Sequence, residues 1–561
     1  MRGFKKLMVF TLAAVITASA AGCGSSTSKS EAGNTAVTQA GENSETESAA
    51  AEGDSKNSSA DSKNSSADSQ NSSADGQSTG GDAGKTTTTG GTVKVSVGSE
   101  PDNLDPMLSS ATDTSAIMMN VFEGLLGFNE KGEFIPALAE TYEISEDGLT
   151  YSFKLKQGIK FHDGADFTSK DVKYTYEKLA GLNGEAPLNE TLNQLLASVE
   201  TPDDYSVNLV LKEKNAGFLS KATISVVEKD YTQNSTKPIG TGPFKFVEYI
   251  QGQKVILEKY QDYNTIEERV PAIDKVEFKI MTDANACLMG LKSGDLDITS
   301  IDAKNVEALK NDYNIVQGPQ NMVQLMALNN SVEPFNNVKV RQAINYAVNK
   351  EEIINTVVNG NGTKVDSFLS PSMSTYFNSN LKNCYDTDIE KAKVLLKEAG
   401  YENGFKMTIT VPSNYQTHVD TAQVIKNQLS KIGIEADIQL IEWAQWLDAV
   451  YAKANYQATI IGHSGKLDPN DFLNRFDSSY DKNYFKFSDA QYDDLIHEAA
   501  LSTDDAKRVE LFNECQQLLV DQAAAVFIQD PDVIYATSKN VQGMKNYPVT
   551  FLDMSSISLA E

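Results

Sequence analysis

Histidine and serine residues are the first candidates for chemistry, because both can take part in hydrolysis. His497 and Glu498 begin like the zinc motif His-Glu-x-x-His, but Leu501 stands where the second histidine belongs, and one histidine makes a poor zinc site. The run Gly462–Gly465 is close to the Gly-x-Ser-x-Gly elbow of hydrolases, but its second glycine falls one position early. The sequence therefore predicts no catalytic residue, no metal site and no cofactor, and a secreted hydrolase is only a remote alternative.

A pair of tryptophans is the next candidate feature, because aromatic side chains often line ligand clefts. The chain has two tryptophans, Trp443 and Trp446, and both fall in a predicted helix at Trp443–Ala452. Their spacing of three places them on one face of that helix. A buried packing stripe has the same spacing, so spacing alone does not separate a ligand wall from a core.

The elements that must position these residues lie in a region where helices and strands alternate, which is typical of a parallel α/β sheet. The expected strands there are Val323–Leu328, Met407–Val411, Ile434–Ile441, Gln457–Ile461, Ala525–Gln529 and Val533–Ala536. The expected helices are Ile389–Ala399, Val419–Ile432, Trp443–Ala452, Ala490–Leu501 and Ala506–Val520, with a further helix capped by Asn337.

The first half of the chain is richer in strand-like runs separated by turn residues. The expected strands are Thr92–Val97, Tyr142–Ile144, Thr150–Leu155, Ile159–Phe161 and Ser206–Leu211, followed by a β-α-β unit made of Val276–Ile280, Ala284–Leu291 and Leu296–Thr299. Thr168 and Asp171 have the spacing of a capping box and predict the start of a helix.

A series of short motifs runs through this first half in a fixed order. They are Glu123-Gly124-Leu125, Pro136–Glu140, Ser145–Leu155, Lys160–Gly164 and Asp171-Val172, joined by Asn103–Pro106, Lys237–Phe244 and, further on, Val340–Ala347. The series resembles the signature of the family 5 extracellular solute-binding proteins, the oligopeptide- and dipeptide-binding type that serves ABC importers. We expect most signature residues to build the scaffold and to touch no ligand.

The resemblance implies an α/β fold of the two-lobed periplasmic-binding-protein type II, with an extra β-rich subdomain in the first lobe (cluster C). On this basis the core of lobe I comprises residues 92–130, 227–317 and 525–561, and the extra subdomain comprises 131–226. Lobe II comprises 318–524. In the family the last strands return to the first lobe, so the two crossing points act as a hinge.

The resemblance also points to ligand-binding residues in lobe II. Glu442–Leu447 is similar to the family motif whose tryptophan lines the cleft, which favours Trp443 as the cleft residue and Trp446 as a packing residue. Ile461–Leu473 is similar to the recognition loop in which a tryptophan covers the peptide and an aspartate pairs with its α-ammonium. This sequence has His463 and Lys466 at those two positions.

These departures leave alternatives open. Lys466 would repel an ammonium; it could bind a carboxylate, a phosphate or another anion, neutralise Asp468, or be an ordinary surface lysine. If the alignment shifts, Asp468 could serve the ammonium instead. The predicted ligand-binding residues are Trp443, His463, Ser464, Lys466 and Asp468.

The N-terminus predicts export and a lipid anchor. Positively charged residues precede a short apolar run, Leu7–Ala18, which is brief for a membrane span. Ala20–Cys23 follows and resembles a bacterial lipobox, so residues 1–22 are read as a signal peptide and Cys23 as the lipidated residue. Residues 23–91 are rich in Ser, Asn and Asp, contain a seven-residue repeat without large apolar residues, and predict a disordered linker.

Composition excludes other classes of protein. The chain has 77 acidic and 49 basic residues and a net charge of −28, without the basic stripe that nucleic-acid binding requires. The three cysteines beyond Cys23 (Cys287, Cys384 and Cys515) allow at most one disulfide, and free thiols are expected.

These observations predict a monomeric substrate-binding lipoprotein of an ABC importer, held on the outer face of the cell membrane. It would capture a short peptide in the cleft between the lobes by hinge closure and deliver it to a membrane permease. The alternative is the same fold binding an oligosaccharide, an opine-like anionic conjugate or a metal chelate.

Overall fold

The computed structural model of the protein describes residues 87, 88 and 90–560. The predicted signal peptide, Cys23 and nearly all of the predicted linker lie outside these residues. Asp82–Glu561 forms one compact unit. Thr87–Thr88 forms the short strand β1, which pairs with β21 (Ser558–Ala560), although both threonines fall in the range assigned to the linker. The composition that predicts the linker does not reveal this pairing, because the partner strand lies at the far end of the chain.

A large mixed sheet runs through the compact unit in the order β17-β16-β18-β14-β19-β12-β2-β11-β10-β9, with β13 and β15 also paired to β19. Its strands are β2 (Thr92–Val97), β9 (Phe244–Ile250), β10 (Lys254–Lys259), β11 (Lys275–Ile280), β12 (Ile298–Ser300), β13 (Asn314–Pro319), β14 (Met322–Leu328), β15 (Gly362–Lys364), β16 (Lys406–Pro412), β17 (Glu435–Ile441), β18 (Ala458–Ser464) and β19 (Ala525–Thr537). The predicted β-α-β unit is confirmed, since β11 and β12 both pair parallel with β2.

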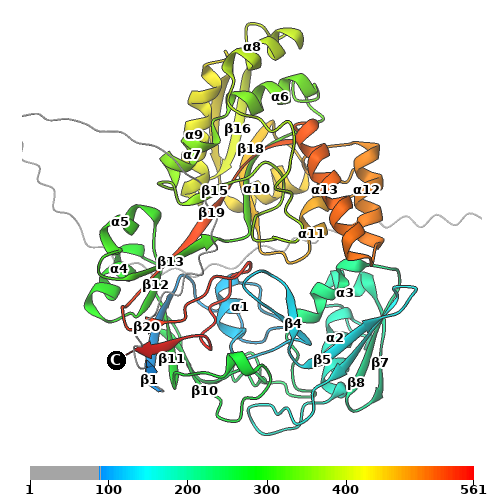
Figure 1. The fold of residues 1–561 in the computed structure, drawn as a ribbon, viewed down its shortest axis with the longest axis vertical. Helices are drawn as coiled ribbons and strands as arrows, with labels where there is room; N and C mark the ends of the chain where they lie inside the picture. The colour runs from blue at the N-terminus through cyan, green and yellow to red at the C-terminus, as the bar shows by residue number, and fades with distance from the viewer. Residues whose placement is uncertain (1–86, 89, 561) are drawn as a thin grey trace, which may run out of the picture. The chain divides into compact units, whose positions relative to one another are not determined.

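β19 lies in the middle of this sheet and joins its two halves (Figure 1). The two short strands predicted at 525–529 and 533–536 are one continuous strand, because Ala525–Gln529 pairs with β14 while the following residues pair with β15, β13 and β12. Pro531 does not interrupt it, since each partner strand takes over where the previous one ends. The chain crosses between the same two regions a second time, where β13 leads into β14.

The expectation of a parallel sheet in the second half is only partly correct. β16 pairs parallel with β17 and β18, but β14 pairs antiparallel with both β18 and β19. Buried strands have the same continuous apolar pattern in either orientation, so the sequence pattern could not distinguish them.

A separate four-stranded antiparallel sheet lies within the range of the predicted β-rich subdomain. Its order is β5-β6-β8-β7, with bounds β5 (Ala139–Ile144), β6 (Thr150–Leu155), β7 (Leu196–Asp203) and β8 (Ser206–Leu211). The predicted strand at Ile159–Phe161 is wrong: this run makes a single bridge, Lys160 with Asp166, because it pairs only with its own return segment. β3 (Leu126–Phe128) and β4 (Phe134–Pro136) form a small hairpin beside this sheet, and the strand β20 (Val541–Gln542) pairs with β21.

Most predicted helices are present, with ends shifted by a few residues. They are α2 (Ser169–Ala180), α4 (Ala284–Ser293), α6 (Val338–Ala347), α8 (Ile389–Glu398), α9 (Gln416–Ser430), α10 (Trp443–Trp446), α12 (Ala490–Leu501) and α13 (Asp505–Asp521). The sequence patterns did not predict the short helices α1 (Thr112–Met118), α3 (Glu190–Leu195), α5 (Val306–Leu309), α7 (Lys350–Val357) and α11 (Asn470–Leu473). The Thr168–Asp171 capping box that begins α2 is confirmed. The helix predicted at Trp443–Ala452 is a single α-turn followed by a π-helical segment, Leu447–Ala452.

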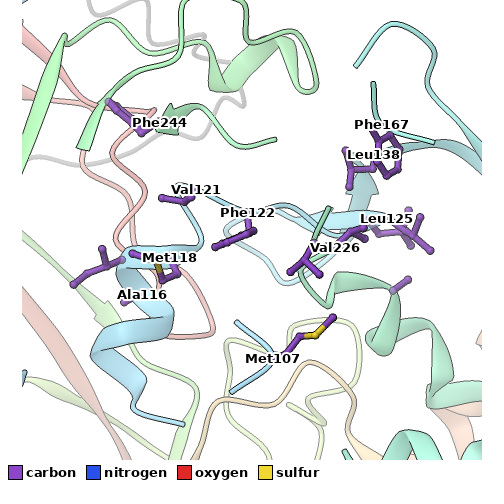
Figure 2. Packing of buried hydrophobic residues seen from close by; sticks show 14 of the residues in the cluster. Met107, Ala116, Met118, Val121, Phe122, Leu125, Leu138, Phe167, Val226 and Phe244 are labelled. Carbon is purple, nitrogen blue, oxygen red and sulfur yellow. The ribbon is translucent and has the colours of Figure 1, made fainter. Parts of the chain in front are cut away.

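The apolar residues form separate cores on the two sides of the crossing strands. One core joins residues of the first half with residues near the C-terminus; Figure 2 shows part of it, including Met107, Phe122 and Phe244. Two further cores lie among residues 323–528, one on each face of the β14 region. This distribution fits the predicted two lobes, whose boundaries stay a prediction.

The signature motifs meet inside the first core, which explains their spacing. The carboxylate of Glu123 accepts hydrogen bonds from Thr241 Oγ1 at 3.0 Å and from Tyr263 OH at 2.7 Å. An added Cβ on Gly240 would lie 2.0 Å from the carbonyl oxygen of Val121, so only glycine permits this approach of two backbones. These residues hold the fold together from within.

Among the described residues, no helix is long and apolar enough to cross a membrane. Cys287, Cys384 and Cys515 are free thiols, as expected.

Candidate functional site

A cavity of about 830 Å³ lies against the two crossing points of the chain. One side is formed by residues 301–304, which follow β12, and the other by β18, the start of α9 and α10. Gln320, between β13 and β14, and Asp532, on β19, contribute from the crossing segments themselves. We call this space the Trp443 cavity. A ligand bound here would contact both sides of the crossing and both crossing segments.

Aromatic rings form one wall of the Trp443 cavity. The indole of Trp443 is half-buried; it stacks on Trp446 with 5.1 Å between ring centroids and meets Tyr415 edge to face at 5.4 Å. Trp446 is 2% exposed, and its Nε1 donates a hydrogen bond to Thr459 Oγ1 at 2.9 Å. Trp446 is therefore a packing residue that supports Trp443, while contact between Trp443 and a ligand stays a prediction.

His418 adds a neutral polar group to the same cavity. Burial lowers its pKa to about 4, so the imidazole is uncharged at neutral pH. Gln324 donates from Nε2 to His418 Nδ1 at 2.9 Å, and Gln324 Oε1 accepts from Thr421 and from Gln529 Nε2. With the amide in this orientation the imidazole proton lies on Nε2. The buried network fixes the ring and leaves a neutral donor for a ligand.

Ser464 lies at the end of β18, opposite Met322 of β14, and lines the Trp443 cavity with an exposed side chain. Sequence alone placed the end of this strand at Ile461, three residues too early. The loop that follows is tied to the crossing segment, because Asn321 Nδ2 donates to the carbonyl oxygen of Lys466 at 2.6 Å. The predicted recognition loop is therefore tied to the crossing between β13 and β14 at one point and continues into α11.

Lys466 faces a second, smaller cavity of about 320 Å³, which we call the Arg508 cavity. Its side chain is exposed, and among the described residues no carboxylate oxygen lies within 4.0 Å of its Nζ. Desolvation by neighbouring protein atoms lowers the pKa of Lys466; Asp471 opposes this shift, and the positive charges of Lys221 and Arg475 add to it. Charges of both signs therefore surround Lys466, and Lys221 and Asp471 are paired with each other at 3.3 Å.

Asp468 is not available in the way the sequence suggested. It is buried, and Arg508 Nη2 donates to Oδ1 at 3.0 Å and to Oδ2 at 2.8 Å. An added Cβ on Gly217 would lie 3.0 Å from Asp468 Cγ, so the backbone of the 3-10 segment Ala216–Thr223 covers the carboxylate. The suggested pairing of Asp468 with Lys466 is wrong, because Arg508 of α13 already neutralises this acid. Contact between Asp468 and a ligand stays a prediction, and the ion pair with Arg508 and the cover by Gly217 disfavour it.

His463 points into the second half's core and lines neither cavity. Its Nε2 is 2.7 Å from Tyr484 OH, and its ring meets Phe368 edge to face at 5.3 Å. Burial lowers its pKa well below the ordinary value. Alternation along β18 explains the placement, since Gly462 and Ser464 face the Trp443 cavity and the residue between them faces away. Its predicted role in covering a ligand would require the side chain to turn round.

A serine, a histidine and an aspartate also meet at the surface, which bears on the hydrolase alternative. His497 Nε2 is 2.7 Å from Asp477 Oδ2 and 3.5 Å from Ser479 Oγ. A catalytic triad uses the two different imidazole nitrogens for these contacts. Here both contacts fall on Nε2, so the arrangement cannot relay a proton from the serine. The described residues also include no group of three or more His, Cys, Asp or Glu able to hold a metal.

Comparison with known proteins identifies the family. Residues 133–484 match the profile of the bacterial extracellular solute-binding proteins, family 5, middle region. The chain belongs to this family. The dipeptide-binding protein of Escherichia coli is 31% identical over 487 residues, which cover 79% of this chain and 90% of that protein.

Solved structures agree with the sequence comparison. The ABC transporter-associated periplasmic binding protein DppA of Helicobacter pylori, in complex with the peptide STSA, is 28% identical with a TM-score of 0.70, over 84% of this chain and 99% of that one. The binding protein AgaA of A. tumefaciens R10, in complex with agropinic acid, is 29% identical with a TM-score of 0.68, over 84% and 99%. The predicted type II periplasmic-binding-protein fold is confirmed.

Sequence reasoning missed Tyr415, His418 and Asp532, which belong to no motif used above. The apolar periodicity of α9 marks its buried face but does not reveal that its first turn borders a cavity. Asp532 could not be found from local sequence, because its position depends on β19 crossing between two regions of the sheet.

Proposed function

We propose that this solute-binding protein is the lipid-anchored receptor of an ABC importer, that it captures a short peptide and delivers it to a membrane permease, and that it is not an enzyme. The observation that carries this proposal is the Trp443 cavity, which borders both crossing segments and has an aromatic wall. Family membership and the peptide-binding relatives support it.

The proposed mechanism is closure of two lobes about the crossings at β13–β14 and β19. The cavity contains groups from both sides of these crossings, such as Lys304 on one side and Trp443 on the other. A ligand that touches both sides binds the closed arrangement more tightly than the open one, which is the thermodynamic requirement for ligand-driven closure. The closed monomer is then the form that the permease recognises.

We further propose that the ligand carries an anionic group near Lys466. Lys466 replaces the aspartate that the family resemblance places there, and no carboxylate among the described residues pairs with its ammonium group. This feature also favours a second candidate, an opine-like anionic conjugate, and the similarity to the agropinic acid complex supports that candidate. An oligosaccharide or a metal chelate would need the same neutral donors but makes no use of the positive charge.

The anchoring part of the proposal rests on Cys23, which follows a short apolar run and small residues. Lipidation at the start of a long polar linker would hold the receptor at the outer face of the cell membrane. Fractionation of cells that express Cys23→Ala tests this: the variant should leave the membrane fraction, and full retention there would contradict lipidation at this residue.

Mass spectrometry of the molecule that co-purifies with the protein tests the ligand class. A short peptide, recovered with the same mass after incubation with the protein, is the expected result. Calorimetry with a panel of dipeptides should then give saturable binding to the purified chain. Recovery of cleaved peptides would support a hydrolase, whereas recovery of a sugar or a chelate with no peptide binding would replace the proposed ligand.

A further inference from the structure

Asp532 stands out in the Trp443 cavity because its charge has no partner in the part of the chain that the structure describes. The residue lies on β19 opposite Pro319 of β13, and its backbone N–H donates to the carbonyl oxygen of Asn361 at 3.1 Å. Its side chain is half-buried and lines the cavity. Among residues 90–560, no Lys, Arg or His nitrogen lies within 4.0 Å of its carboxylate.

The other acids of the cavity differ from Asp532. Asp302 is paired with Lys304 at 2.8 Å, so this pair contributes little net charge. Asp420 is exposed and accepts a hydrogen bond from Gln416 at 2.7 Å. Burial raises the pKa of Asp532, which means that the protein withdraws this carboxylate from water without compensating its charge. An uncompensated, half-buried carboxylate is the kind of group that a ligand cation would complete.

The aromatic wall adds a second feature that suits a cation. Trp443 and Tyr415 both line the cavity, and a cationic group over the face of an indole or phenol ring is attracted by the ring quadrupole. His418, in the same lining, is neutral and does not repel a cation. The aromatic rings of Trp443 and Tyr415 and the neutral His418 are therefore compatible with an ammonium group attracted by Asp532.

We propose that Asp532 binds the ammonium group of the ligand, in place of the loop aspartate whose position is held by Lys466. The proposal rests on the proposed peptide-binding function and deepens it by giving the ligand a direction. The amino end of the ligand lies at the crossing strand β19, and the rest of the ligand extends along the aromatic wall of the Trp443 cavity. A solute-binding protein with an acid at the position of Lys466 would favour a positively charged ligand group at that position.

Binding of dipeptides with a free and an acetylated amino group tests this proposal. The probes are alanyl-alanine, alanyl-phenylalanine and leucyl-leucine, each in both forms, titrated into the parent, Asp532→Asn and Asp494→Asn proteins by calorimetry. The parent should bind at least one free dipeptide about tenfold or more tightly than its acetylated form. Asp532→Asn should lose that factor for the free dipeptide and keep the affinity for the acetylated one. Asp494→Asn removes an exposed acid of α12 that lines neither the Trp443 nor the Arg508 cavity, so it is the matched control and should bind like the parent.

Two results would overturn the assignment. One is that Asp532→Asn and Asp494→Asn both bind the free dipeptide as the parent does. The other, which does not depend on a folded variant, is that the parent binds free and acetylated dipeptides equally well. If the parent binds none of the six probes, the proposed peptide ligand fails and this inference fails with it; if it binds them without discrimination, only the role of Asp532 fails.

Discussion

Replacing Asp468 by alanine should destabilise the protein strongly without acting through a ligand. The structure places this carboxylate against Arg508, with both of its oxygens accepting from Nη2, at 3.0 and 2.8 Å. Both side chains are almost fully buried, at 9% exposure for Asp468 and 5% for Arg508. Removing the acid leaves the guanidinium with two neutral acceptors, the carbonyl oxygen of Ala499 at 3.1 Å and Tyr376 OH at 3.3 Å.

The magnitude follows from the buried charge that remains. Breaking a buried ion pair by removing one partner costs about 3–5 kcal/mol, because the other charge stays desolvated and uncompensated. The two neutral acceptors partly satisfy Arg508, so we expect a loss of about 3 kcal/mol for Asp468→Ala, at the lower end of that range. The double variant Asp468→Ala with Arg508→Met should be more stable than Asp468→Ala alone, because it removes the unpaired charge and keeps an apolar side chain.

Urea denaturation followed by tryptophan fluorescence measures these differences, since Trp446 is buried in the same half of the chain. Asp471→Ala is the matched control. Asp471 forms an ion pair with Lys221 at 3.3 Å, but both side chains are partly exposed, so its loss should cost no more than about 1 kcal/mol. The reasoning is refuted if Asp468→Ala unfolds like the control. A variant of unchanged stability that binds free-amine dipeptides more weakly would instead make Asp468 a ligand residue.

Three other predictions concern the two cavities and the hinge. Trp443→Ala should weaken ligand binding in calorimetry, while Trp446→Ala should mainly lower the thermal midpoint; the reverse pattern would show that the two rings are assigned wrongly. Lys466→Ala should weaken the co-purified ligand about ten- to a hundredfold, since a sheltered bond to a charged group contributes about 1.5–3 kcal/mol, and unchanged affinity would make Lys466 a surface lysine. Burial raises the pKa of Asp530 to about 7, above its unfolded value, so its contribution to stability is present at acid pH and is lost as the pH rises toward 7. The unfolding free energy of the parent, relative to that of Asp530→Asn, should therefore fall between about pH 4 and 7, and a constant difference would contradict the shifted pKa.

Local sequence was sufficient wherever one short segment decides its own structure. Thr168 and Asp171 satisfy each other's backbone and start α2 as predicted, and the alternating pattern of Thr92–Val97, Thr150–Leu155 and Ser206–Leu211 gave strands with the predicted bounds. The ordered series of signature motifs indicated the family. Glu123, in one of these motifs, and its hydrogen-bond partners help to hold the first core together. The family resemblance also predicts that Lys466 occupies the position of an ammonium-binding aspartate.

Only the tertiary structure decided which of the candidate residues line a cavity. His463 and Ser464 are neighbours in sequence, but strand alternation turns one into the core and the other into the Trp443 cavity. Asp468 meets Arg508 across 40 residues, and Asp532 reaches the cavity because β19 crosses between two regions of the sheet. Neither fact is encoded by local pattern, since the neutralisation of a carboxylate depends on which distant side chain the fold brings within hydrogen-bonding distance. The sequence by itself determined the family and the composition of the recognition loop; long-range packing decided which of its charges are already paired.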